Sequence, residues 1–108
     1  NSAEIKNGSF DGFIGIYTLT EGAGHRAKYL LESSYSNARV EVNSDHEATD
    51  RLTNLAKKAD VFIFAWKSSK HQAFFCVKNA RSSKSLIMPI GKGSASIVRS
   101  ASQCIETM

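Results

Sequence analysis

Two turns of this sequence hold residue types that bind anions. The first, KSSKH, directly follows the apolar run DVFIFAW at 60–66 and precedes a helical pattern with an apolar face. A lysine in the first turn of a helix opposes the helix dipole, and a bound anion would offset that cost. We therefore predict an anion-binding loop here. Its predicted residues are Lys67, Ser68, Ser69, Lys70 and His71.

The second turn is GKGSAS, at Gly91–Ser96. Its two glycines permit a tight turn, Ser94 or Ser96 can cap the following helix, and the backbone N–H groups there can hold a phosphate or carboxylate. The turn is not a Walker loop, because Lys92 is followed by Gly93. Anion binding and an ordinary glycine turn with a serine cap are equal alternatives. The predicted binding residues are Gly91, Lys92, Gly93, Ser94 and Ser96.

His71 is the candidate catalytic residue. It can contact a ligand, make a structural hydrogen bond, or act as an acid or base. No acidic partner lies near it in the sequence, so a triad is not indicated. His25 and His46 fall in other turns, but carboxylates or cysteines at metal-ligand spacing are missing, and we predict no metal site.

A dinucleotide site is only weakly indicated. Gly22 and Gly24 follow the first apolar run, but the third glycine of a dinucleotide turn is replaced by Ala27. Asp45 lies at about the right distance for a ribose-binding acid. The cofactor therefore remains unassigned.

Cysteines and aromatic residues are assigned to the core. Cys76 and Cys104 are too few for a disulfide scaffold, which favours a reducing compartment, and they fall on apolar helix faces. Redox or nucleophilic chemistry is the alternative to core packing for these cysteines. Trp66, Phe74 and Phe75 adjoin the basic turn, where stacking on a nucleic-acid base is the alternative to core packing.

The elements that must position these turns alternate along the chain. Apolar runs predict strands at 12–19, 38–45, 60–66 and 85–90, and helical spacing predicts helices at 24–35, 46–59, 71–81 and 94–108. This order predicts an α/β fold: a small three-layer domain with a four-stranded parallel sheet in the order 2-1-3-4, Rossmann-like or flavodoxin-like. Ligands of such sheets bind at the carboxyl ends of the strands, where Thr20 joins the predicted site.

Composition sets the class of protein. The chain has 108 residues, of which 42% are hydrophobic and 22% charged, typical of one folded domain. We expect a loose segment at 1–9 and a single domain at 10–108, cut from a larger protein because the sequence begins without methionine. No apolar run is long enough to span a bilayer, so we expect a cytoplasmic protein without a membrane partner.

The charge is uneven along the chain. Seven Lys/Arg stand against nine Asp/Glu up to Asp60, whereas seven Lys/Arg stand against Glu106 alone from Val61 onward. A positive second half attracts anions, either a phosphorylated small molecule or a nucleic-acid backbone.

From residue 59 to residue 101 the chain resembles an uncharacterised family of short bacterial Rossmann-like domains. The matching positions are Ala59 and Asp60, then His71 with Ala73, Val77 and Lys78, and then Gly93, Ser96 and Arg99. The family's serine before the histidine is Lys70 here, one of its paired serines is Ala95, and Lys92 is the nearest substitute for an absent arginine. The resemblance implies a compact α/β domain in bacteria or their mobile elements, often attached to other domains. It implies no reaction.

The leading hypothesis is a binding domain for a phosphorylated ligand, either a nucleotide or a nucleic-acid phosphate, at the carboxyl edge of the sheet. The first alternative is a hydrolase or transferase that acts on a nucleotide or nucleic acid with His71 as acid or base. The second is a structural or oligomerising module of a larger nucleic-acid-associated protein. The sequence assigns neither the identity of the ligand nor the oligomeric state.

Overall fold

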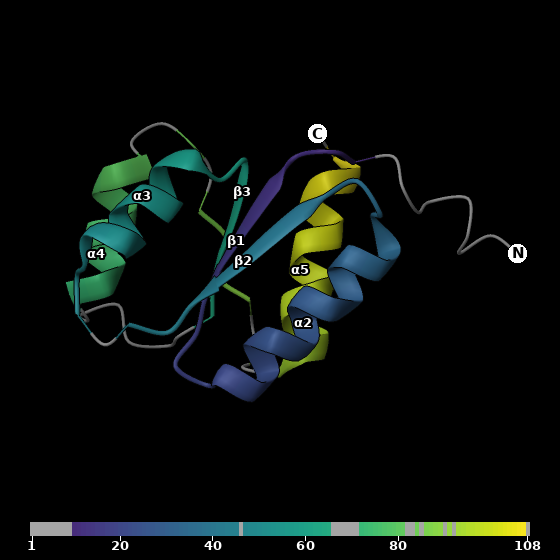
Figure 1. Ribbon diagram of the computed structural model, residues 1–108, viewed down its shortest axis with the longest axis horizontal. Coiled ribbons are helices and arrows are strands. Elements are labelled where there is room, and N and C mark those ends of the chain that lie inside the picture. The colour runs from purple at the N-terminus through teal and green to yellow at the C-terminus, as the bar shows by residue number, and fades with distance from the viewer. Residues whose placement is uncertain are drawn as a thin grey trace, which may run out of the picture.

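The structure, a computed structural model, describes residues 10–45, 47–65, 72–81, 84, 86–89, 91 and 93–107. Strands and helices alternate from residue 13 to residue 81, and a last helix follows (Figure 1). The elements in chain order are β1 (Phe13–Tyr17), α2 (Glu21–Ser34), β2 (Arg39–Asn43), α3 (Asp50–Lys58), β3 (Val61–Phe64), α4 (Gln72–Arg81) and α5 (Ser94–Glu106).

The strands form one parallel sheet in which β1 lies between β2 and β3. Ile14 of β1 is in register with Val40 of β2 on one side and with Val61 of β3 on the other. α2 connects β1 to β2, and α3 connects β2 to β3, so both crossovers are helical. The α/β class and the parallel sheet predicted from the sequence are confirmed.

Residues 86–89, the described part of the predicted fourth strand, do not form a strand. Ile87 makes only an isolated parallel bridge to Ile63: its N–H donates to the Phe62 carbonyl at 3.0 Å and its carbonyl accepts from the Phe64 N–H at 2.7 Å. The next rung of a parallel ladder would need an N–H at residue 89, and Pro89 has none. The four-stranded sheet in the order 2-1-3-4 is therefore wrong, and the described residues form a three-stranded sheet in the order 2-1-3.

Helices cover both faces of the sheet. α2 and α5 pack together on one face, and α3 and α4 pack together on the other (Figure 1). Because side chains of a strand alternate between faces, the strands feed two separate cores. Ile14, Ile16 and Ile63 belong to the core with α2 and α5, whereas Phe62 and Phe64 belong to the core with α3 and α4. The apolar runs of β1 and β3 are continuous because both faces of these strands are covered, whereas β2 alternates and exposes Arg39 and Glu41.

Capping residues set the beginning of α3. Thr49 has an extended backbone, and its Oγ1 accepts a hydrogen bond from the Leu52 N–H at 3.2 Å, so the helix begins at Asp50. Ala48, which falls within the predicted helix at 46–59, is exposed and precedes the helix. The predicted start at residue 46 is therefore too early.

A buried arginine caps the other end of α3. Arg81 is only 2% exposed, and its guanidinium donates to the carbonyls of Ala56 at 2.9 Å and Ala59 at 2.8 Å. It also lies over the Phe62 ring, 5.6 Å from the centroid. A cation at a helix C-terminus satisfies carbonyls that have no partner within the helix. Arg81 thereby fixes the last residue of α4 against the end of α3.

Candidate functional site

The carboxyl ends of β1, β2 and β3 lie at one edge of the sheet, because the three strands are parallel. Thr18–Thr20 leaves this edge toward α2, and residues 44–45 and 47–49 lie between this edge and α3. Ile87 makes a parallel bridge to Ile63 of β3, so α5, which follows it, also begins at this edge. The beginnings of α2, α3 and α5 therefore share this edge, and their unpaired N–H groups and dipoles favour anions.

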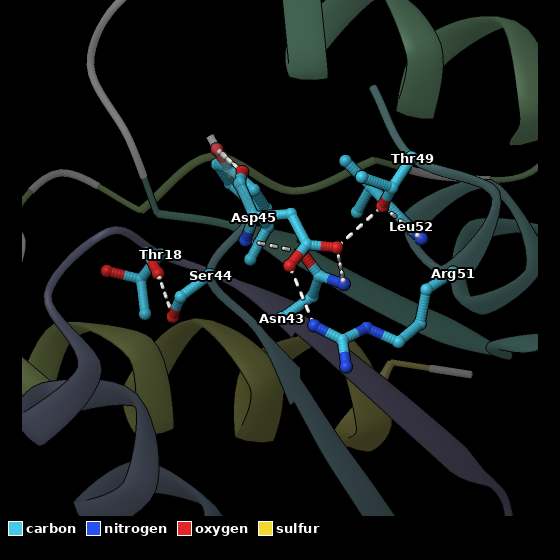
Figure 2. A network of polar contacts seen from close by, with 8 residues as sticks. Thr18, Asn43, Ser44, Asp45, Thr49, Arg51 and Leu52 are labelled. Carbon is cyan, nitrogen blue, oxygen red and sulfur yellow. Dashed lines mark hydrogen bonds and ion pairs between the residues drawn. The ribbon is translucent and has the colours of Figure 1, made fainter. Parts of the chain in front are cut away.

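The turn after β1 is fixed by Thr18, which is fully buried. Its Oγ1 accepts a hydrogen bond from the Thr20 N–H at 3.1 Å. Its carbonyl accepts one from the Ser44 hydroxyl at 2.6 Å (Figure 2). Thr20 is the N-cap residue of α2, but its exposed side chain makes no capping hydrogen bond. The hydroxyl of this predicted site residue is therefore available to a ligand.

The two glycines near the start of α2 lie within the helix. Gly22 has open space around its Cα, whereas a Cβ at Gly24 would lie 2.8 Å from both the Thr18 Cγ2 and the Val42 Cγ1. Gly24 thus lets the first turns of α2 approach the ends of β1 and β2 closely. These glycines do not form the phosphate turn of a dinucleotide site.

Asp45 organises the turn between β2 and α3. One carboxylate oxygen accepts hydrogen bonds from the Asn43 amide at 3.1 Å and from the Thr49 hydroxyl, and the other accepts from Arg51 at 2.7 Å (Figure 2). The Asp45 N–H donates back to the Asn43 side chain at 2.9 Å, and the Asp45 carbonyl accepts from the Tyr17 hydroxyl at 2.6 Å. One residue therefore links β1, β2 and the cap of α3.

The electrostatics of this turn follow from those contacts. Hydrogen bonds from Thr49 and Arg51 lower the pKa of Asp45 from its ordinary value. Burial, and after it the nearby Asp45 carboxylate, raise the pKa of Tyr17 to about 12. At neutral pH Asp45 is therefore an ionised acceptor, and Tyr17 is a neutral hydroxyl that donates.

A small polar hollow adjoins the Asp45 turn. Its volume is about 210 Å³, and it is lined by Glu21, His25, Val42, Ser44, Asp45 and Arg51. Arg51 is 74% exposed on its side chain and pairs with Asp45. Because two carboxylates face this hollow, we assign it to the wall of the site and not to its anion-binding part.

The start of α5 carries the described part of the glycine-serine turn. Gly93 is the N-cap residue and therefore offers no side chain for a cap, and its carbonyl accepts from the Ile97 N–H at 3.2 Å. A Cβ at Gly91 would lie 2.6 Å from the Ser96 Oγ, so the chain passes close to the first turn of α5. Ser94 and Ser96 are partly buried and Gly93 is exposed.

Several predicted site residues lie outside the described residues. These are Lys67, Ser68, Ser69, Lys70, His71 and Lys92, and His46 of the second turn lies outside them as well. The structure places Thr20, Gly91, Gly93, Ser94 and Ser96 in the segments that leave the carboxyl edge. Their joint site with the basic turn stays a prediction.

The Asp45 turn is the part of this edge that sequence reasoning undervalued. The sequence suggests Asp45 only as a ribose-binding acid, whereas in the structure its carboxylate accepts hydrogen bonds from Asn43, Thr49 and Arg51. The sequence does contain a pattern that indicates the structural role of Asp45. Asn-Ser-Asp at the end of an apolar run is typical of a turn in which side chains hydrogen-bond to the backbone.

Two absences hold for the part of the chain that the structure describes. It contains no group of three or more His, Cys, Asp or Glu side chains that could hold a metal ion. Within the same residues, no helix combines the length and the apolar character needed to cross a membrane.

Comparison with known proteins identifies a family and nothing closer. No curated protein and no solved structure matches the chain. The model of the DpdD-like family matches residues 2–100, a longer span than the resemblance to an uncharacterised family seen at 59–101. Because this match covers nearly the whole chain, the protein belongs to the DpdD-like family.

Proposed function

We propose that this chain is a binding domain for a phosphorylated ligand, a nucleotide or a nucleic-acid phosphate, at the carboxyl edge of its sheet. The observation that carries the proposal is the position of β1 between β2 and β3. From β1 the chain passes through α2 to β2, which pairs with one edge of β1. It then passes through α3 to β3, which pairs with the opposite edge of β1. Ligands of open parallel sheets bind in the crevice at such a reversal of strand order.

The charges around this crevice favour its α5 side for the anion. Glu21 and Asp45 lie toward α2 and β2, and they would repel a phosphate there. The start of α5 has an exposed glycine as its N-cap and no acidic residue in its first turn. The N–H groups of this turn and the helix dipole are therefore the described groups best suited to a phosphate.

The remaining polar groups of the edge would orient the ligand. Thr20 offers a hydroxyl that is not used in capping, and Asp45 holds the neighbouring turn in place. Lysines of the second half of the sequence, including Lys70 and Lys92, would add positive charge. We assign binding, and no reaction, to this arrangement.

The substitution Ser94→Asp tests this function. An aspartate at the first position of α5 stabilises the helix through its dipole but puts a negative charge where the phosphate is proposed to bind. We expect a slightly raised melting temperature together with a loss of binding to adenosine diphosphate of about tenfold or more, because a charged contact is replaced by repulsion. Calorimetric titration measures the binding.

Gln103→Glu is the matched control, since it adds the same charge to α5 far from its first turn. This variant should bind adenosine diphosphate as the unchanged chain does. If the unchanged chain binds neither adenosine diphosphate nor a short oligonucleotide, or if Ser94→Asp binds as well as the control, the proposed function is wrong.

A further inference from the structure

A larger hollow lies beside α5. Its volume is about 690 Å³, within the range of ligand-binding clefts. One wall is the segment Ile87–Pro89, and the other wall is the side of α5 that carries Arg99 and Gln103. No residue of β1, β2 or β3 is among its described lining, so it lies at the outer border of the sheet, and we call it the edge groove.

The sheet ends at this groove with backbone groups that could pair with a further strand. Ile87 directs both its N–H and its carbonyl toward β3, where they bond Phe62 and Phe64. Successive residues of an extended chain direct these groups to opposite sides, so the N–H and carbonyl of Met88 point away from β3. Met88 is also 45% exposed. The border of the sheet at the edge groove therefore presents one donor and one acceptor to a further strand.

The α5 wall combines apolar surface, including Cys104, with polar groups and one positive charge. Its polar groups are the hydroxyls of Ser96, Ser100 and Thr107, the amide of Gln103, and the guanidinium of Arg99, whose residue is exposed. No acidic residue is among the described lining of the groove. Within the described residues Arg99 makes no ion pair. The groove therefore complements an occupant with a carboxylate and further hydrogen-bonding groups.

We propose that the edge groove binds an extended acidic peptide, which adds a strand beside Met88 and places a carboxylate at Arg99. A further strand would lie about 4.8 Å from the segment Ile87–Pro89 and would run beneath α5. Main-chain hydrogen bonds would hold the peptide, and the carboxylate would set its register.

Charge decides between this occupant and a second copy of the chain. Two copies paired through the same sheet border would each bring an Arg99 to the interface, and like charges there repel. An acidic peptide meets the same arginine favourably. This proposal does not rest on the proposed phosphate site: the two regions share Ser96, but the peptide is argued from Met88 and Arg99 alone.

Fluorescence anisotropy with labelled Thr-Val-Glu-Val-Thr and its aspartate counterpart tests the proposal. We expect saturable binding of at least one acidic peptide, a loss of about tenfold in affinity with Arg99→Gln, and no binding of the same peptide with N-methylated valines. Arg26→Gln is the matched control, because Arg26 is an exposed arginine on the neighbouring helix α2. It should leave the affinity unchanged.

Amide hydrogen exchange then locates the peptide. The Met88 amide should exchange more slowly when the peptide is bound, while exposed amides of α2 keep their rates. The proposal is overturned if neither peptide binds, if Arg99→Gln and Arg26→Gln behave alike, or if N-methylation has no effect. A dimer in sedimentation that protects the Met88 amide without any peptide would assign the groove to a second copy and overturn it as well.

Discussion

Asp45 is the residue on which the described part of the carboxyl edge depends most. Its carboxylate accepts hydrogen bonds from Asn43, Thr49 and Arg51, and its carbonyl accepts one from Tyr17. These partners come from β1, β2 and the start of α3. Without the carboxylate, the Thr49 hydroxyl and the Asn43 amide lose their acceptor together.

We predict that Asp45→Ala lowers the free energy of unfolding by about 2 kcal/mol, the usual cost of removing a charged acceptor from several donors. Urea denaturation at neutral pH measures the change. Asp11→Ala is the control, since Asp11 is exposed, and its unfolding curve should match that of the unchanged chain.

The stability difference between the unchanged chain and Asp45→Ala should also depend on pH. Because the pKa of Asp45 is lowered in the folded chain, its stabilising contribution is present above the unfolded value of about 3.9 and is lost as the pH falls through the folded value. The stability difference between the unchanged chain and Asp45→Ala should therefore be constant near neutrality and shrink below about pH 4. A difference that persists undiminished in acid would contradict this role.

At the scale of elements, the packing of α2 against the strand ends depends on Gly24. A Cβ there would lie 2.8 Å from side-chain carbons of Thr18 and Val42, whereas Gly22, in the same turn of helix, has nothing near it. Alanine favours a helix over glycine by up to about 1 kcal/mol, so the two positions separate packing from helix propensity.

We predict opposite signs for the two alanine substitutions. Gly24→Ala should lower the free energy of unfolding by about 1–3 kcal/mol, because the core must shift to admit the methyl group. Gly22→Ala should raise it by about 0.5–1 kcal/mol. Thermal and urea denaturation measure both, and equal effects of the two substitutions would show that α2 does not approach the strands as described.

The elements also show what the sequence could predict. The run DVFIFA indicated a strand buried on both faces, and the structure has β3 there with helices on either side. The run SLIMPI gave the same signal, but Pro89 removes the N–H that the second rung needs, so a hydrophobic pattern alone overestimated the sheet. The predicted start of α3 was wrong for a related reason. The N-cap hydrogen bond of Thr49, and not the spacing of apolar residues, decides where this helix begins.

The sequence predicted the parallel sheet whose carboxyl edge carries Thr20, but it did not predict the side-chain contacts at that edge. The common site of Thr20 and the start of α5 stays a prediction. The role of Asp45 depends on contacts with Thr49 and Arg51, which no periodicity reveals. The basic turn with Lys70 and His71 lies outside the described residues and stays a prediction.

At the scale of the whole molecule, α5 borders both proposed surfaces. Its first residues, after Gly93, lie at the carboxyl edge, and its later residues, from Ser96 to Thr107, line the edge groove. Ser96 belongs to both regions, because its hydroxyl lies beside Gly91 and it also lines the groove. A phosphorylated ligand and an acidic peptide would therefore meet neighbouring parts of one helix and share Ser96.

The most direct test of the central claim is an NMR titration of the backbone amides with adenosine diphosphate. The account predicts that the largest shift changes fall on Gly93, Ser94 and the rest of the first turn of α5, with smaller ones at Thr20. Residues 36–38, which precede β2 at the opposite edge of the sheet, should not respond. Changes centred on residues 36–38, or no saturable change anywhere, would contradict a phosphate site at the carboxyl edge.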